Sequence, residues 1–282
     1  MLLAILVSLF INGLSVVDLT LRGLLIIAVS VLILTGTHFS SAIHWKRLHT
    51  ALMLSAVPVM FVFFVQLLPW DIAGIINSLL PTQYSDTPAF NFINMPLGFL
   101  TFLVAILLSG LLRWNHERHQ EQDSSKNIVA GVTLGSALTI GVTAVVLWRQ
   151  PDLQPVILPF EHGWMIVVNS WKNLQTLLVG VGPEQFLTAF HNLRDVSFNT
   201  TDVWSLRFQA SSSEFFHILT TLGVLGAAAW LVTLGGGMLQ TLKLRQDNPE
   251  LLALWLVLFL SFFLFPCSPL HYGLLVFAIW GT

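Results

Sequence analysis

Long hydrophobic runs separated by short polar connections make up most of this chain. Runs long enough to cross a bilayer lie at 1–17, 20–36, 50–68, 96–112, 128–148, 215–239 and 251–265, and a partial run covers 270–282. A helix needs about 20 mainly apolar residues to cross the hydrocarbon core, and lipid offers no water to pair an open backbone. None of the runs shows the alternation of a membrane β-barrel. The pattern predicts an all-α polytopic integral membrane protein with about seven to eight transmembrane helices.

One polar interruption, residues 149–214, is much longer than the others. It divides the chain into about five N-terminal transmembrane helices over 1–148, a large loop with short amphipathic helices, and about two to three C-terminal helices over 215–282. A single large folded loop in a membrane protein is a common location for binding or catalysis. The final hydrophobic run stops about 13 residues after Pro269, short of a full span, so we expect a truncated chain.

Composition supports a lipid environment and narrows the possible partners. The chain is 55% hydrophobic and only 9% charged, whereas a soluble domain carries roughly 25% charged residues. A formal net charge of -2 gives no basic excess, so we expect no nucleic-acid partner. Cys267 is the only cysteine, which excludes an intramolecular disulfide and a thiolate metal site. We expect neither a metal nor a cofactor.

The distribution of basic residues predicts the orientation in the membrane. Seven of the 12 Lys and Arg residues lie in three short connections, at 37–49, 113–127 and 240–250. The positive-inside rule places these connections in the cytoplasm and the 149–214 loop outside it. Tryptophans at positions 45, 70, 114 and 148 lie near predicted helix ends, as residues of an interfacial aromatic belt do.

The loop contains its own helical signals. Apolar residues recur near helical spacing over 163–178, at Trp164, Val167, Val168, Trp171, Leu174, Leu177 and Leu178. They predict one amphipathic helix, which either lies on the membrane surface or packs on its own domain. The sequence Gly180-Val181-Gly182-Pro183 then ends that helix and starts another with Phe186, Phe190 and Leu193 on one face. A turn between two helices explains this glycine pair as well as phosphate binding does.

The end of the loop combines a helix start with positive charge. Ser211 and Glu214 fit a capping box before the next apolar run. A helix N-terminus at an outward surface is also an anion site, and Arg194 and Arg207 lie upstream. Two guanidinium groups would suit a diphosphate, because each binds phosphate oxygens in a bidentate manner. The alternative is that the arginines pair with Asp195 and Asp202 inside the loop.

Three short motifs together resemble a known family. They are Gly180-Val181-Gly182-Pro183-Glu184-Gln185-Phe186, the segment 198–208 (FNTTDVWSLRF) and the segment 214–226 (EFFHILTTLGVLG). In this order they resemble the bacterial O-antigen ligase and O-antigen polymerase superfamily of polytopic membrane glycosyltransferases. The resemblance covers about residues 160 to 230. It is carried by the order of the motifs and by no single one of them.

The resemblance implies a function at the outer face of the bacterial cytoplasmic (inner) membrane. It implies transfer of a glycan from an undecaprenyl-diphosphate carrier to a lipid, protein or growing polysaccharide acceptor, without a metal or a nucleotide sugar. The partners would be the undecaprenyl-diphosphate-linked glycan, the glycan acceptor and membrane lipid. Arg207 best matches a family arginine that binds the carrier diphosphate, and Arg194 matches less closely.

The chain departs from the family at the histidine that the family favours as general base. The family's His-Asn pair falls on Ser212 and Ser213 here, and a serine hydroxyl cannot serve as a base at neutral pH as imidazole does. These serines remain candidates for substrate binding. His217, His191 or Glu214 would then act as the base, with His162 a further histidine of the loop. A non-catalytic protein for assembly or sensing, or a transporter, is the alternative.

Overall fold

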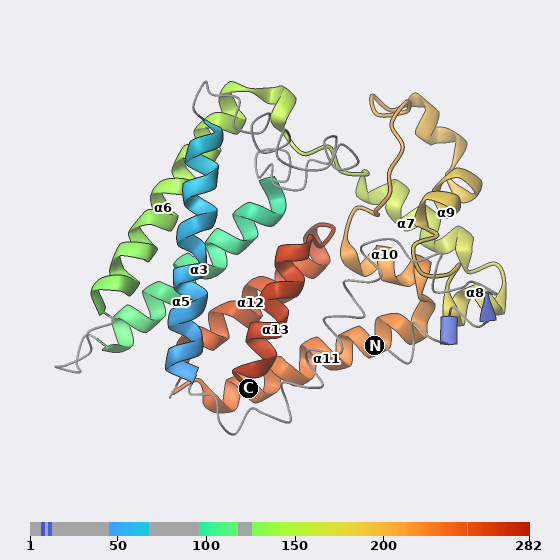
Figure 1. Ribbon diagram of the computed structural model, residues 1–282. Coiled ribbons are helices and arrows are strands. Elements are labelled where there is room, and N and C mark those ends of the chain that lie inside the picture. The colour runs from blue at the N-terminus through green and yellow to red at the C-terminus, as the bar shows by residue number, and fades with distance from the viewer. Residues whose placement is uncertain (1–6, 9–10, 13–44, 68–95, 118–125, 247) are drawn as a thin grey trace, which may run out of the picture.

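The computed structural model describes residues 7–8, 11–12, 45–67, 96–117, 126–246 and 248–282 (Figure 1). Within these residues every regular element is a helix, and no strand is found. The predicted spans at 1–17 and 20–36 lie almost entirely outside the described residues, and so does Trp70. The description that follows therefore concerns the later spans and the segment between them.

Four helices are long and apolar enough to cross a membrane. They are α3 (Trp45–Gln66), α5 (Pro96–Glu117), α6 (Lys126–Arg149) and α11 (Gly223–Leu244). The 22 residues of α5 extend about 33 Å at 1.5 Å per residue, which matches a hydrocarbon core of about 30 Å. Helices α3, α5 and α6 confirm the predicted runs at 50–68, 96–112 and 128–148, and α12 (Pro249–Leu264) and α13 (Pro269–Trp280) are shorter apolar helices.

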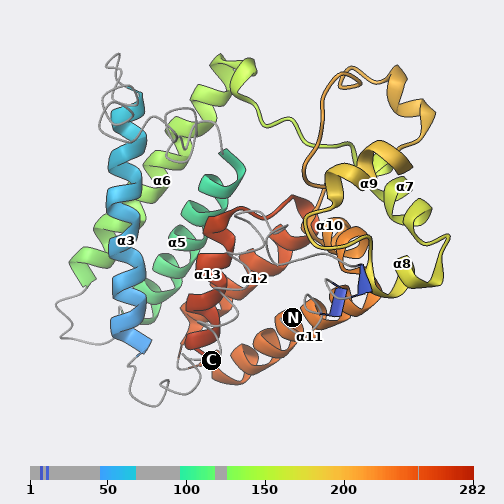
Figure 2. The same cartoon turned by 45° about the vertical axis from the view of Figure 1, so that its right-hand side comes forward.

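These helices pack into one bundle. Helix α5 contacts α3, α6, α12 and α13, and α12 also contacts α11. In both ribbon views α13 lies beside α5 and α12, while α11 extends from this bundle toward α8 and α10 (Figures 1 and 2). Large side chains fill the interior; for example, the rings of Phe63 and Phe99 stack with centroids 4.8 Å apart, and Trp255 is fully buried.

Buried polar groups join the bundle at the end where α3 begins and α5 ends. The Arg113 guanidinium lies 3.0 Å from His49 Nδ1 and donates to Thr50 Oγ1 at 3.0 Å. Trp45 Nε1 donates to Glu250 Oε1 at 2.8 Å, which ties α3 to α12. Buried charges of this kind are tolerated because hydrogen bonds replace the lost hydration. They lie at the helix ends rather than halfway along the apolar helices.

The predicted span 215–239 is not a single helix. It is divided into α10 (Glu214–Thr221) and α11, which begins at Gly223, and Leu222 separates the two. Gly223 has a φ of 65°, and a Cβ there would lie 2.5 Å from the backbone of Leu178. The break therefore arises from close contact with a distant part of the chain, which only glycine permits.

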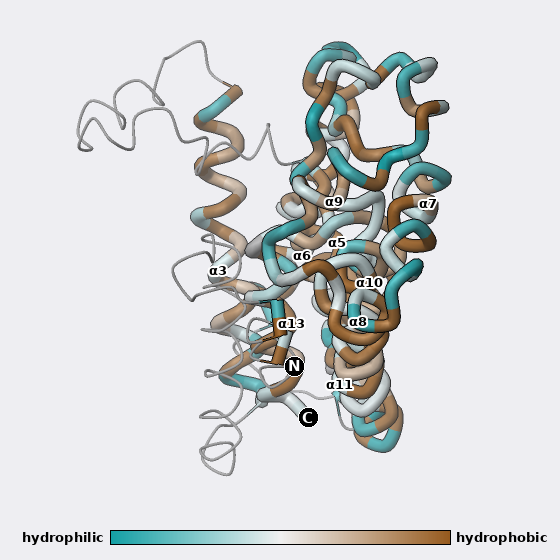
Figure 3. Tube along the Cα trace, turned by 90° about the vertical axis from the view of Figure 1, so that its right-hand side faces the viewer, coloured by the Kyte–Doolittle hydropathy of each residue, from teal (hydrophilic) through white to brown (hydrophobic). Residues whose placement is uncertain are grey.

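The segment between α6 and α10 folds around its own core. After the 3₁₀ turn η4 (Pro151–Leu153) it contains α7 (Phe160–Ser170), α8 (Leu174–Val179), α9 (Phe186–Leu193) and the 3₁₀ helix η5 (Val196–Thr200). Four buried phenylalanines, at positions 186, 190, 198 and 208, form most of this core with Leu158, Ile166 and Ala189. The hydropathy view shows hydrophilic residues spread over the segment around α7 and α9, whereas α11 is mostly hydrophobic (Figure 3).

The predicted continuous helix over 163–178 is two helices. It is interrupted after Ser170, and Asn173 starts α8 by accepting a hydrogen bond from the Gln175 N–H at 3.0 Å. Asparagine competes with helical backbone bonding in this way and so favours caps over helix interiors. Of the predicted apolar stripe, Val167 is buried, whereas Trp164, Val168, Leu174 and Leu178 are exposed.

The Gly180-Val181-Gly182-Pro183 turn is bound to the end of α10. The N–H groups of Val181 and Gly182 donate to the carbonyls of Thr220 (2.9 Å) and Thr221 (3.1 Å). These amides therefore satisfy the open carbonyls at a helix C-terminus, which favours the structural interpretation of the glycine pair over phosphate binding. The prediction that Pro183 opens the next helix is wrong, because a turn intervenes and α9 begins only at Phe186.

Candidate anion-binding site

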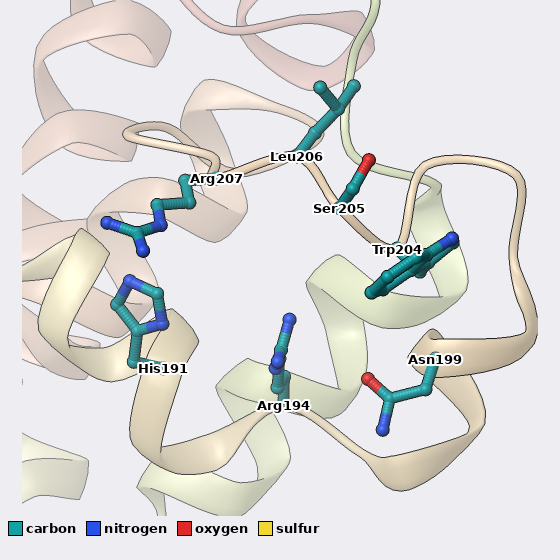
Figure 4. Close-up of a pocket in the computed structure, with 7 residues that line it drawn as sticks. All are labelled: His191, Arg194, Asn199, Trp204, Ser205, Leu206 and Arg207. Atoms are coloured by element: carbon teal, nitrogen blue, oxygen red, sulfur yellow. The ribbon is translucent and has the colours of Figure 1, made fainter.

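An open pocket of about 650 Å³ lies between the end of α9 and the loop that follows η5. Figure 4 shows the side chains around it. The lining residues are His191, Arg194, Asn199, Trp204, Ser205, Leu206 and Arg207. The structure thus brings together both arginines and one of the histidines that the sequence singles out.

Arg194 is held in place by the aromatic core of the segment. It forms the C-cap of α9, and its guanidinium carbon lies 5.4 Å from the Phe190 ring centroid and 5.3 Å from that of Phe198. Both rings are fully buried, so they provide a rigid surface for a cation–π contact. The half-buried guanidinium points into the pocket (Figure 4).

Arg207 and His191 enter the pocket from different elements. Arg207 precedes Phe208, whose buried ring lies 5.8 Å from Phe190 and so anchors this part of the loop. His191 lies in the last turn of α9. The Arg207 guanidinium and the His191 ring face each other, and both side chains are exposed to solvent (Figure 4).

The alternative of internal ion pairs is not what the structure shows. Asp195 instead accepts hydrogen bonds from the Val196 N–H (2.6 Å) and Ser197 Oγ (3.1 Å), and so caps η5. In the part of the chain that the structure describes, neither Arg194 nor Arg207 pairs with a carboxylate. Two guanidinium groups that face one open pocket can bind phosphate oxygens in a bidentate manner.

Glu214 does not line this pocket; its carboxylate instead joins separate helices through hydrogen bonds. Its buried carboxylate accepts hydrogen bonds from the Cys267 N–H (2.9 Å) and the Tyr272 hydroxyl (3.0 Å), and its own N–H donates to the Phe265 carbonyl. These bonds connect the start of α10 to the turn between α12 and α13 and to α13 itself. The carboxylate is therefore occupied by the protein and is buried away from solvent.

The predicted capping box at Ser211 is wrong. Ser213 is the N-cap of α10 and accepts a hydrogen bond from the Phe216 N–H at 3.3 Å. Glu214 is the first helical residue, and its carboxylate turns to α13 instead of back to the helix start. Ser211 and Ser212 are buried, and their hydroxyls have no hydrogen-bond partner among the described residues.

The other two candidate histidines of this region, His162 and His217, are buried outside the pocket. The His217 ring lies 5.2 Å from Phe186, and the His162 ring lies 5.3 Å from Phe198 in an edge-to-face arrangement. Next to His162, a Cβ on Gly163 would lie 2.0 Å from Ser212 Oγ, so α7 passes close to the start of α10. His191 is therefore the only one of the sequence-selected bases that reaches the pocket in the described structure.

Four further lining residues were not identified from the sequence: Asn199, Trp204, Ser205 and Leu206. The signal in the sequence was a tryptophan three residues before Arg207 in a polar segment. In the structure Trp204 is 59% exposed, although tryptophan normally buries most of its surface. An exposed indole beside two arginines offers a flat apolar surface to a ligand.

No family model, no curated protein and no solved structure matches this chain.

Proposed function

We propose that this chain is a multi-pass protein of the bacterial cytoplasmic membrane that transfers a glycan from a polyprenyl diphosphate, such as undecaprenyl diphosphate, to an acceptor hydroxyl. The observation that carries the proposal is the gathering of Arg194, Arg207 and His191 around one open pocket (Figure 4). The resemblance of the ordered motifs to those of O-antigen ligases and polymerases is a second support.

The proposed orientation places the pocket outside the cytoplasm. Lys46, Arg47, Lys243 and Arg245 lie at the start of α3 and the end of α11, and positive charge of this kind favours the cytoplasmic side. The segment after α6 then faces outward. Trp164 is exposed on α7, where its ring contacts Trp171 and Phe216; these aromatic residues suit an interface with lipid headgroups.

The residues of the pocket would divide the reaction between them. His191 would take the proton from an acceptor hydroxyl as its oxygen attacks the anomeric carbon of the donor sugar. The bond from that carbon to the carrier diphosphate would break, and the electron pair would leave on the diphosphate. Arg194 and Arg207 would stabilise the negative charge that develops there.

Binding of pyrophosphate to the purified protein tests the site itself. We expect Arg207→Ala to weaken binding by about tenfold to a hundredfold, since a hydrogen bond to a charged group contributes about 1.5–3 kcal/mol. The matched control is Arg149→Ala, because Arg149 is also exposed but ends α6 outside the pocket. Equal affinity in the wild type and Arg207→Ala would remove the assigned anion site.

Consumption of a polyprenyl-diphosphate-linked oligosaccharide in proteoliposomes tests the reaction. We expect His191→Ala to bind pyrophosphate as the wild type does but to lose about a hundredfold or more in transfer rate, the usual contribution of a general base. Pyrophosphate binding without any turnover by the wild type would favour a non-catalytic membrane protein over an enzyme.

A further inference from the structure

We infer that a second pocket, on the opposite face of α9, binds a pyranose ring of a neutral saccharide. The pocket has a volume of about 390 Å³ and lies between α9 and the turn that joins α7 to α8. This volume is within the range of small-molecule sites, about 300–1,000 Å³. The binding inference depends only on this pocket, whereas its use for the transferred or accepting glycan rests on the proposed function.

Helix α9 separates the two pockets. Gln185, Ala189 and Asn192 line the second pocket, and their spacing of four and three residues places them on one helix face. His191 and Arg194 line the first pocket from another face. A saccharide in the second pocket would therefore lie on the other side of a single helix from a diphosphate in the first.

The amide side chains of the second pocket are oriented by bonds within the protein. Asn169 Nδ2 donates to the Leu193 carbonyl at 2.9 Å, so its amide oxygen is left as an acceptor. Asn173 Oδ1 accepts from the Gln175 N–H at 3.0 Å, so its amide nitrogen is left as a donor. The lining of the pocket thus includes one amide with a remaining acceptor and one with a remaining donor.

Gln185 repeats this arrangement at the start of α9. Its Oε1 accepts a hydrogen bond from Thr188 Oγ1 at 3.1 Å, which leaves its amide nitrogen as a donor. Asn192 adds a further amide to the lining. A sugar hydroxyl donates one hydrogen bond and accepts others, so fixed amides of both kinds match a ring that carries several hydroxyls.

The floor and the charge of the pocket favour a neutral ring. Val181, Ala189 and Leu193 supply an apolar surface, and Val181 and Leu193 pack on the phenylalanine core. The C–H face of a pyranose can pack on such a surface. Lys172 is the only charged residue of the lining, in contrast to the two arginines of the first pocket.

Saturation-transfer NMR with the methyl pyranosides of glucose, galactose and N-acetylglucosamine, each at millimolar concentration, tests the inference on the full chain in detergent. We expect at least one glycoside to give a signal with the wild type. Asn192→Leu should weaken that binding about fivefold to tenfold, the effect of losing about one neutral hydrogen bond. Gln175→Leu should not, because Gln175 is an exposed amide on α8 that does not line the pocket.

Pyrophosphate binding distinguishes the outcomes. Asn192→Leu should retain it, which shows that the variant is folded, and Arg207→Ala should lose it while still binding the glycoside. The inference is overturned if no glycoside gives a signal with the wild type, if Asn192→Leu binds like the wild type, or if pyrophosphate displaces the glycoside. Glycoside binding by a wild-type protein without transferase turnover would refute the proposed function alone.

Discussion

At the residue scale, Arg194 shows how the phenylalanine core of the segment orients a cationic side chain toward a ligand. Its guanidinium rests against the buried rings of Phe190 and Phe198. A planar guanidinium in this position keeps its N–H edge directed at the pocket, whereas a lysine ammonium is a point charge on a flexible stem. The rings therefore favour arginine for its shape as well as its charge.

Arg194→Lys should accordingly weaken pyrophosphate binding even though it conserves charge. We expect a loss of about tenfold, because the bidentate geometry and the ring contact are both removed. Isothermal titration calorimetry measures the change, and Arg149→Lys at the exposed end of α6 is the control. An Arg194→Lys variant with wild-type affinity would show that charge alone accounts for binding.

The neighbouring serines Ser212 and Ser213 should differ in how much stability their alanine variants lose. Ser213→Ala removes the N-cap hydrogen bond to Phe216 and should cost about 1 kcal/mol. Ser212→Ala removes a buried hydroxyl that has no partner in the described structure, so stability should be unchanged or slightly higher. Thermal unfolding midpoints test both predictions. If Ser212→Ala lowers the midpoint more than Ser213→Ala does, the Ser212 hydroxyl takes part in a hydrogen bond.

At the element scale, the fold depends on two glycines 43 positions apart in sequence, at 180 and 223. A Cβ on Gly180 would lie 2.3 Å from the carbonyl of Thr221, and a Cβ on Gly223 would lie 2.6 Å from the Gly180 nitrogen. The two backbones touch because both positions lack side chains. This contact joins the end of α8 to the junction of α10 and α11.

Alanine at either of these glycines should be strongly destabilising. The positive φ values, 72° and 65°, cost a side chain about 1–3 kcal/mol by themselves, and contact with backbone atoms adds to this. Gly141→Ala in α6 is the matched control, since its added Cβ meets no described atom within 4 Å and alanine favours a helix. If Gly180→Ala and Gly141→Ala unfold at the same temperature, the close contact does not exist.

The same glycines show where sequence reasoning succeeded and where it could not. Helices α3, α5 and α6 follow from long apolar runs, a local property that a window of residues reveals. The break at Gly223 depends on backbone contact with Gly180, so it cannot be predicted from the run 215–239 alone. Likewise, the arginines were identifiable by their charge in a polar segment, but their convergence depends on Phe190, Phe198 and Phe208 meeting in one core.

At the scale of the whole molecule, the bundle and the folded segment are joined at α10. At one end of this helix, Glu214 accepts hydrogen bonds from the turn between α12 and α13 and from Tyr272 on α13. The glycine contact holds its other end. The phenylalanine core of the segment positions the pocket, while the apolar helices pack around the core of the bundle. Helix α10 is thus held at both ends, between the segment that carries the pocket and the helices that would cross the membrane.

Labelling of single cysteines tests this arrangement in a bilayer. With Cys267→Ser as the background, Ser197→Cys places a thiol on η5 near the pocket, and Arg245→Cys places one after α11; both parent residues are exposed. Since basic residues favour the cytoplasmic side, a membrane-impermeant maleimide should label Ser197→Cys in intact spheroplasts and Arg245→Cys only after permeabilisation. Labelling of Arg245→Cys but not of Ser197→Cys in intact spheroplasts would mean that the protein has the reverse orientation. The anion site would then face the cytoplasm, where a glycan carried on the outer leaflet could not reach Arg194 and Arg207.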